Sequence, residues 1–290
     1  MRNRRYHLYM CIMLVVCFLI IFVLVGFQAQ AAPSSFVEST LIQARTADRF
    51  INTIGVNIHL HYSDTVYSQS FDEIIKPKLL ASGIRHVRDG TYTSDGHHRD
   101  HFYYRRMFFE HFNRDIPRIY IYEFINTFSD STTNHEASFG LLRHDESEKP
   151  AYKAIKNMIT ILDDTDNAFA PGKFDVTITG GDDSIHRSLL QKSNGTFYLV
   201  LWQEKPSWDR HEHKEITVPP QEFTLTLGAP IATAQLYTPL TSAESIKQYT
   251  EPDELTLSVP DHPIIIALKP TQPQQGSVYT LTLPLIISAR

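Results

Sequence analysis

Cysteine is nearly absent from this sequence. Both cysteines of the 290-residue chain, Cys11 and Cys17, lie in an apolar segment near the N-terminus. The rest of the chain therefore has no disulfide, no zinc-thiolate site and no cysteine nucleophile. A basic cluster is also lacking and the formal net charge is −5, so we expect no nucleic-acid partner.

Residues 1–31 have the layout of a secretory signal. Arg2, Arg4 and Arg5 precede an apolar run, and Ala29-Gln30-Ala31 follows with the spacing that a signal peptidase recognises. We therefore expect cleavage after Ala31 and a secreted or extracytoplasmic protein. The alternative is an uncleaved membrane anchor, since about 20 apolar residues also suffice to span a bilayer. A membrane partner is expected only in that case.

Residues 32–168 read as strands alternating with helices, after a lead-in over residues 32–50 that holds at most a short helix. The strands and helices are expected at residues 54–62, 71–82, 84–87, 101–112, 119–124 and 150–162. Pro77 is expected to bend or break the second of these, a helix that stops before Gly83. Such strand-helix-strand units build parallel sheets.

Residues 172–270 follow a different pattern. Short β-type segments are separated by Gly, Pro, Asn and Asp, with no helical periodicity between them. This pattern is typical of an antiparallel β-sandwich. Asn194-Gly195, directly before one of these strands, predicts a tight hairpin turn. Residues 271–290 form a tail with no assigned structure.

Four segments together resemble a known family: IGVNIHLHY, LLASGIRHVRDG, RIYIYEF and FGLLRHDESEKPAYKAIKNMITILDD. They look like clan-A glycoside hydrolases, in which a (β/α)8 barrel is followed closely by a β-sandwich. Residues 51–92 resemble the first two strands with their helix, and residues 101–164 the seventh helix, eighth strand and eighth helix. Residues 172–270 resemble the sandwich. The resemblance implies a fold that is α/β plus all-β, with a partial barrel before the sandwich, and carbohydrate as the partner.

The middle of such a barrel is missing. About 130 residues separate the leader from the boundary near Asp164, whereas a closed eight-stranded barrel needs roughly 200–250. The family's catalytic pair is two glutamates, on the fourth and seventh strands, the first usually following an asparagine. This chain has no Asn-Glu pair and no glutamate between Glu73 and Glu110. Both family positions are therefore missing, and the chain is expected to be an internally truncated, weakly active or inactive glycosidase.

Glu123 is the remaining candidate for a catalytic residue. It lies at the carboxyl end of the strand at residues 119–124, where barrel enzymes hold their functional groups. A glycosidase normally uses two carboxyl groups, so one carboxylate without a placed partner is inadequate. The alternative for Glu123 is a structural ion pair with a neighbouring arginine.

Five further residues are candidates for substrate contacts: Asn57, His59, Arg88, Asp89 and Tyr122. Asn57 and His59 alternate along one strand, so their side chains point to the same face. By the resemblance, Arg88 matches an arginine that lines the active site. The alternative for Arg88 is an ion pair with Asp89 or Glu123.

Aromatic rings are the other feature to weigh, because apolar faces of sugar rings pack on them. Tyr92, Tyr122 and Trp208 are candidates, whereas Trp202 lies within FYLVLWQ and is expected in the core. Two histidine pairs, His97 with His98 and His211 with His213, are interpreted as parts of solvated loops. Neither pair has an apparent third ligand for a metal ion. We therefore expect no metal and no other cofactor.

Three hypotheses about function follow. The first is an exported glycoside-hydrolase relative whose ancestral role was hydrolysis of O-glycosyl bonds. The second is a non-catalytic surface protein whose β-sandwich binds glycan or another protein. The third is an unproductive gene remnant.

Overall fold

The computed structural model describes residues 37–60, 65–89, 104–129, 135–164, 166, 168–209, 212 and 214–272. The chain divides into two compact units, Met1–Ser35 and Phe36–Arg290, and every described residue belongs to the second. The expected leader and Tyr92 lie outside the described residues, as does the tail from residue 273. Within the described part, no helix combines the length and apolarity needed to cross a membrane.

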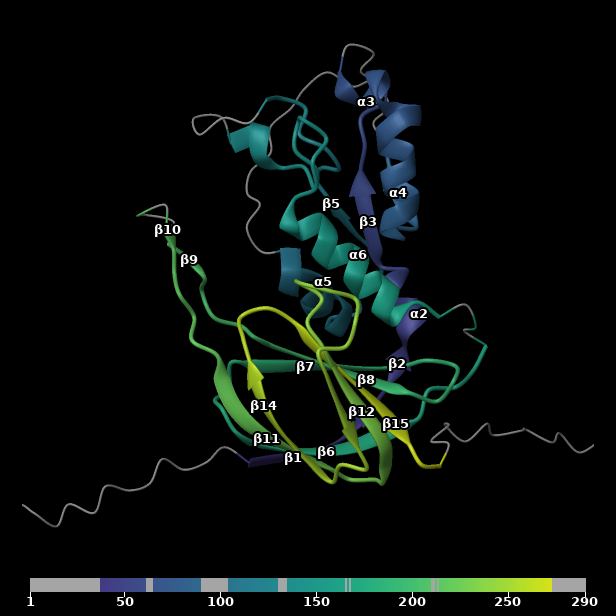
Figure 1. Ribbon diagram of the computed structural model, residues 1–290, viewed down its shortest axis with the longest axis vertical. Coiled ribbons are helices and arrows are strands. Elements are labelled where there is room, and N and C mark those ends of the chain that lie inside the picture. The colour runs from purple at the N-terminus through teal and green to yellow at the C-terminus, as the bar shows by residue number, and fades with distance from the viewer. Residues whose placement is uncertain are drawn as a thin grey trace, which may run out of the picture. The chain divides into compact units, whose positions relative to one another are not determined.

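A three-stranded parallel sheet forms in the first half of the chain, in the order β4-β3-β5. Figure 1 labels β3 and β5 of this sheet. Its strands are β3 (Ile54–Asn57), β4 (His86–Arg88) and β5 (Ile119–Ile121). In the register, Gly55 of the central strand pairs with His86 on one side and Tyr120 on the other. The expected parallel pairing is confirmed. The strands are shorter than the sequence pattern suggested, since β3 ends at Asn57 and β5 at Ile121.

In the described part of the chain, one helix precedes these strands and the others come after the first of them. Their bounds are α2 (Ala47–Ile51), α3 (Val66–Gln69), η1 (Phe71–Ile75, a π-helix), α4 (Lys76–Ser82), α5 (Tyr104–Asn113), η2 (His135–Ser138, a 3-10 helix) and α6 (Pro150–Leu162). The helix expected over 71–82 is indeed divided, and Pro77 lies in the first turn of α4, where its missing N–H is tolerated. The helix ends at Gly83, whose φ of 72° is left-handed.

Two larger sheets contain most of the remaining strands. One has four strands in the order β1-β6-β11-β14, and the other has six in the order β13-β12-β15-β8-β7-β2. The bounds are β1 (Val37–Gln43), β2 (Arg45–Thr46), β6 (Lys173–Gly180), β7 (Ile185–Gln191), β8 (Phe197–Gln203), β11 (Gln221–Leu227), β12 (Ile231–Tyr237), β13 (Lys247–Thr250), β14 (Glu254–Val259) and β15 (Ile264–Pro270). A small ribbon pairs β9 (Trp208–Asp209) with β10 (Lys214–Glu215). The hairpin expected at Asn194-Gly195 joins β7 to β8, with Gly195 at a φ of 84°.

The lead-in at residues 32–50 contains the expected short helix, α2, and also two strands, β1 and β2, that the sequence pattern did not reveal. Strand β1 pairs antiparallel with β6 along its whole length, from Val37 opposite Thr179 to Gln43 opposite Lys173. Its apolar residues Val37 and Leu41 are 61% and 60% exposed. The usual alternation of buried apolar and exposed polar residues is therefore absent from this edge strand, which is why the pattern did not reveal it.

Two apolar clusters form the core, and strand β8 contributes to both. Tyr198, Val200 and Trp202 belong to the cluster that contains the buried residues of α2, α5 and α6. Phe197, Leu199 and Leu201 belong to the cluster shared by the two large sheets. All seven residues of β8 are buried because both faces of the strand are covered. The core position expected for Trp202 is confirmed.

The described structure is thus mixed, with several sheets, few helices and mostly β structure. This agrees with the coarse expectation of an α/β part followed by an all-β part. In the described residues from β6 to β15 there is no helix.

Candidate functional site

Glu123 lies just beyond the carboxyl end of β5, and its side chain is buried. Its backbone N–H donates to Phe139 O (3.2 Å), and its carbonyl accepts from Leu141 N (3.0 Å). The next residue along the chain, Phe124, donates its N–H to Asn57 O (3.1 Å) at the end of β3. These backbone bonds place Glu123 at the edge where the parallel strands end, as the sequence analysis expected.

Two hydroxyl groups and one imidazole contact the Glu123 carboxyl group. Tyr67 donates its hydroxyl to Oε2 (3.1 Å). Thr127 donates its hydroxyl to Oε2 (3.1 Å) and its backbone N–H to Oε1 (3.3 Å). Nε2 of His59 lies 3.4 Å from Oε2. The structure therefore brings together two predicted residues, His59 and Glu123, and adds two others.

Burial decides the protonation of this carboxyl group. Only 2% of Glu123 is exposed, and this burial raises its pKa to about 7. Hydrogen bonds from Thr127 and Tyr67, together with the charge of Lys149, lower the pKa but do not cancel the effect of burial. The pKa of Tyr67 is raised well above its usual value, first by its own burial and then by the neighbouring Glu123. Near neutral pH the carboxyl group is present in both protonation states, so it can donate or accept a hydrogen bond.

Aromatic rings surround His59. Its ring meets Tyr67 and Tyr122 edge to face, with centroid distances of 5.3 and 5.2 Å. Tyr122 also lies against Phe139, 5.8 Å away. Tyr122 is half-buried, and His59 contacts both its ring and the Glu123 carboxyl group.

The other three predicted contacts occupy different environments. Asn57 is half-buried, and within the described part of the chain its Oδ1 has no hydrogen-bond partner. Arg88 pairs with Asn57 in the sheet register, and its carbonyl accepts from Ile58 N (2.8 Å). Arg88 and Asp89 are both exposed, unlike Glu123. Their roles as substrate contacts stay predictions.

Several residues of this site were missed in the sequence. Tyr67 lies 56 residues before Glu123, and no spacing rule links the two. Thr127 comes four residues after Glu123. This spacing is only a weak signal in the sequence, because the two side chains meet only if the chain turns directly after the strand. Asn126 accepts hydrogen bonds from Gly140 N (2.7 Å) and Lys149 Nζ (2.8 Å), and so connects the loop after β5 to the start of α6.

Gly140 allows this close approach of two backbone segments. A Cβ at this position would lie 2.3 Å from Asn126 N and 2.6 Å from Leu142 O, which are backbone atoms that cannot easily move. We expect Gly140→Ala to lower the free energy of unfolding by about 1–3 kcal/mol through overpacking. Urea unfolding measures the change.

The control is the exposed neighbour Ser138. Ser138→Ala is expected to change the free energy of unfolding by no more than about 0.5 kcal/mol. Equal effects of the two substitutions would show that the loop relaxes around an added methyl group.

Comparison with known proteins does not assign the chain to a family. No protein-family profile and no curated protein matches the chain. A similar solved structure is the crystal structure of CelM2, a bifunctional glucanase-xylanase protein from a metagenome library, with 18% identity and a TM-score of 0.27. The alignment covers 42% of this chain and 22% of that one, so it spans much less than half of the CelM2 chain. A likeness at this TM-score does not establish a shared fold.

Proposed function

We propose that this protein is an internally truncated relative of the glycoside hydrolases that binds carbohydrate beside Glu123 without cleaving it. The observation that carries the proposal is the buried Glu123 carboxyl group at the carboxyl end of a parallel strand, next to the half-buried Tyr122. Its placement agrees with that of functional groups in barrel enzymes. Carbohydrate as the ligand comes from the sequence resemblance.

The strand order supports the interpretation of residues 32–168 as part of a barrel. In a closed eight-stranded barrel, the eighth strand pairs with the first, and the first with the second. By the resemblance, β5, β3 and β4 are the eighth, first and second strands, and β3 lies between the other two. The helices agree, since α6, the equivalent of the eighth, contacts both α5 and α4.

Exposed apolar side chains agree with a missing middle. Val87 on the edge strand β4 is 51% exposed, and Leu80 on α4 is 76% exposed. In a complete barrel a third strand and a second helix would lie next to these elements. We propose in addition that the two large sheets over residues 172–270, joined by β1, form the trailing β-sandwich. Export by way of residues 1–31 belongs to the same proposal.

Catalysis is not expected. Retaining glycosidases place two carboxyl groups about 5–5.5 Å apart, and inverting ones about 6.5–9.5 Å apart. The described groups within 3.4 Å of the Glu123 carboxyl oxygens are hydroxyls, a backbone N–H and an imidazole. They can hold a sugar hydroxyl or orient a proton. By the resemblance, both glutamates of the family's catalytic pair are missing from this chain, so Glu123 has no placed partner.

The test separates binding from cleavage. The purified full-length protein is titrated calorimetrically with a panel of β-linked oligosaccharides and assayed for hydrolysis of aryl β-glycosides. We expect saturable binding to at least one oligosaccharide and no hydrolysis above background. Tyr122→Ala should weaken binding by about twofold to tenfold, since stacking on an aromatic ring is typically worth about 0.5–1.5 kcal/mol beyond its area burial.

Tyr249→Ala is the control, because Tyr249 is a half-buried tyrosine of β13 in the six-stranded sheet. It should leave binding unchanged. Hydrolysis that Glu123→Gln abolishes would show an active enzyme with Glu123 as its catalytic acid. Absence of binding to every oligosaccharide would contradict carbohydrate as the ligand.

A further inference from the structure

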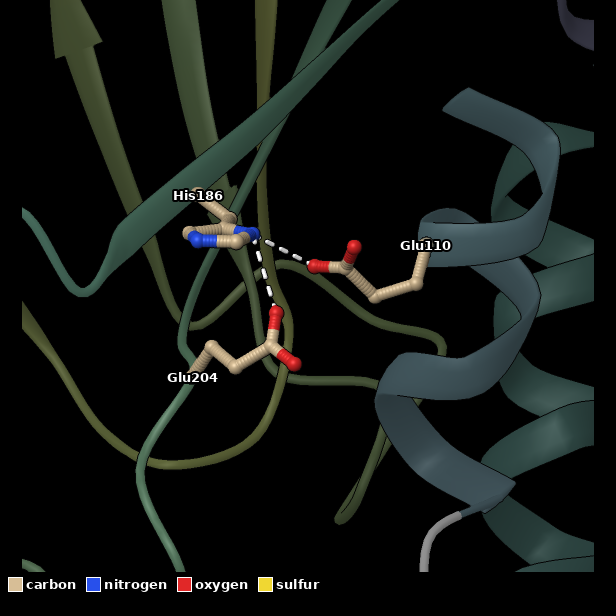
Figure 2. Close-up of side chains that lie close together, drawn as sticks. All are labelled: Glu110, His186 and Glu204. Carbon is tan, nitrogen blue, oxygen red and sulfur yellow. Dashed lines mark hydrogen bonds and ion pairs between the residues drawn. The ribbon is translucent and has the colours of Figure 1, made fainter. Parts of the chain in front are cut away.

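Glu110, His186 and Glu204 converge from three separate elements (Figure 2). Glu110 lies on α5, His186 on β7, and Glu204 follows β8 directly. Nδ1 of His186 is 2.5 Å from Glu110 Oε1 and 3.1 Å from Glu204 Oε2. One atom from each residue lies within 4.8 Å of the others. Glu110 and His186 are 76 residues apart in the chain, so no sequence motif announces this cluster.

Strand pairing and hydrogen bonds position the residues of this cluster. His186 pairs with Trp202 across the β7–β8 register, and Glu204 N donates to Ser184 O (2.7 Å). Trp202 Nε1 donates to Glu110 Oε1 (3.0 Å), while Arg114 bonds the other oxygen of Glu110. Hydrogen bonds of this kind orient a carboxylate that serves as a metal ligand.

One proton cannot satisfy this geometry well. An imidazole Nδ1 carries at most one hydrogen, yet two carboxylate oxygens lie within 3.1 Å of it. A straight hydrogen bond to one oxygen leaves the other facing the same nitrogen. A divalent cation in place of the proton would bind all three atoms at once.

We propose that Glu110, His186 and Glu204 form a binding site for a divalent transition metal of the Zn²⁺ type. One imidazole and two carboxylates form a nitrogen–oxygen donor set that such ions accept, and a water completes four-coordination. Ligand atoms about 2.0–2.2 Å from Zn²⁺ lie about 3.3–3.6 Å apart in a tetrahedron, slightly more than the 3.1 Å separation from His186 to Glu204. The Glu110 contact, at 2.5 Å, has to open by about 1 Å.

Exposure provides an entry path for the ion. The side chain of Glu110 is 11% exposed, whereas those of His186 and Glu204 are 35% and 48% exposed. A metal would therefore approach from the Glu204 side and meet Glu110 last. Once bound, it would tie helix α5 to the β7–β8 strand pair, and the folded state would gain stability with the logarithm of the metal concentration above Kd.

Trp202 is a reporter within the cluster itself. Its indole N–H bonds Glu110, and its ring lies 5.9 Å from that of His186. The chain has two tryptophans, so Trp208→Phe leaves Trp202 as the single one. In the full-length protein carrying this substitution, we titrate Ni²⁺, which quenches nearby indole fluorescence, and then compete with Zn²⁺.

We expect saturable quenching by Ni²⁺, its reversal by Zn²⁺, and one equivalent of Zn²⁺ bound at this site. His186→Ala and Glu204→Gln should each weaken binding roughly tenfold or more, since even loss of an outer hydrogen-bond partner costs tenfold or more. Matched controls are His86→Ala on β4 and Glu222→Gln on β11, which should change nothing. Absence of saturable quenching, or identical titrations in Glu204→Gln and the parent protein, would show a proton-bridged ion pair and overturn the proposal.

Discussion

Phe109→Ala is expected to lower the free energy of unfolding by about 3–5 kcal/mol. Phe109 is fully buried on α5, and its ring stacks on Phe50 with a centroid distance of 4.3 Å and an interplanar angle of 4°. On its other side it lies against Trp202, at 5.5 Å. Truncation would leave a cavity bounded by α2, α5 and β8, and these elements cannot all move inward to fill it.

Urea unfolding monitored by circular dichroism measures this loss. The control is Leu80→Ala on α4, where the leucine is 76% exposed and the expected change is no more than about 0.5 kcal/mol. A loss below about 1 kcal/mol at Phe109 would mean that the helical part does not depend on its packing against β8.

Glu123→Gln is expected to make the protein less sensitive to pH. The pKa of Glu123 is about 7 in the folded state against an ordinary value of 4.5, so the folded state holds a proton that the unfolded state releases. Between pH 4.5 and about 7, rising pH therefore lowers the stability of the wild type. Below the ordinary pKa the effect vanishes, and above about 7 it is complete. The full effect is about 3 kcal/mol.

The measurement is a set of urea unfolding curves at pH 4 and pH 8 for the wild type and the variant. Because glutamine does not ionise, the stability of Glu123→Gln relative to wild type should rise by about 3 kcal/mol between the two pH values. Glu222→Gln, at an exposed position of β11, serves as the control and should track the wild type. A relative stability that stays constant with pH would show that the pKa of Glu123 is the same in the folded and unfolded states, so that burial does not raise it.

The proposed function and the proposed metal site depend on separate residues. Glu123, His59 and Tyr122 lie at the carboxyl ends of the parallel strands, whereas His186 and Glu204 belong to the β7–β8 pair of the six-stranded sheet. Loss of Zn²⁺ binding would therefore leave the carbohydrate proposal untouched. Equally, absence of oligosaccharide binding would not affect the metal proposal.

Local sequence patterns were sufficient for the regular elements whose burial follows their periodicity. Helix α6 was expected over the same residues, Pro150–Leu162, because its apolar residues recur at helical spacing. The Asn194-Gly195 turn forms the expected hairpin between β7 and β8, because the turn geometry favours these residues. Strand β1 was missed because its apolar side chains are exposed on an edge, where the pattern carries no information about burial.

The sequence by itself determined the candidate Glu123 at a strand's end, the alternation of strands and helices in the first half, and the all-β second half. Only the tertiary structure decided what surrounds each acid. Tyr67 reaches Glu123 across 56 residues, and Glu110 meets His186 across 76. The physical reason is that periodicity reports which face of an element is buried, whereas the partners of a buried polar group come from whichever elements pack on that face. Their identity depends on long-range packing that local propensity does not encode.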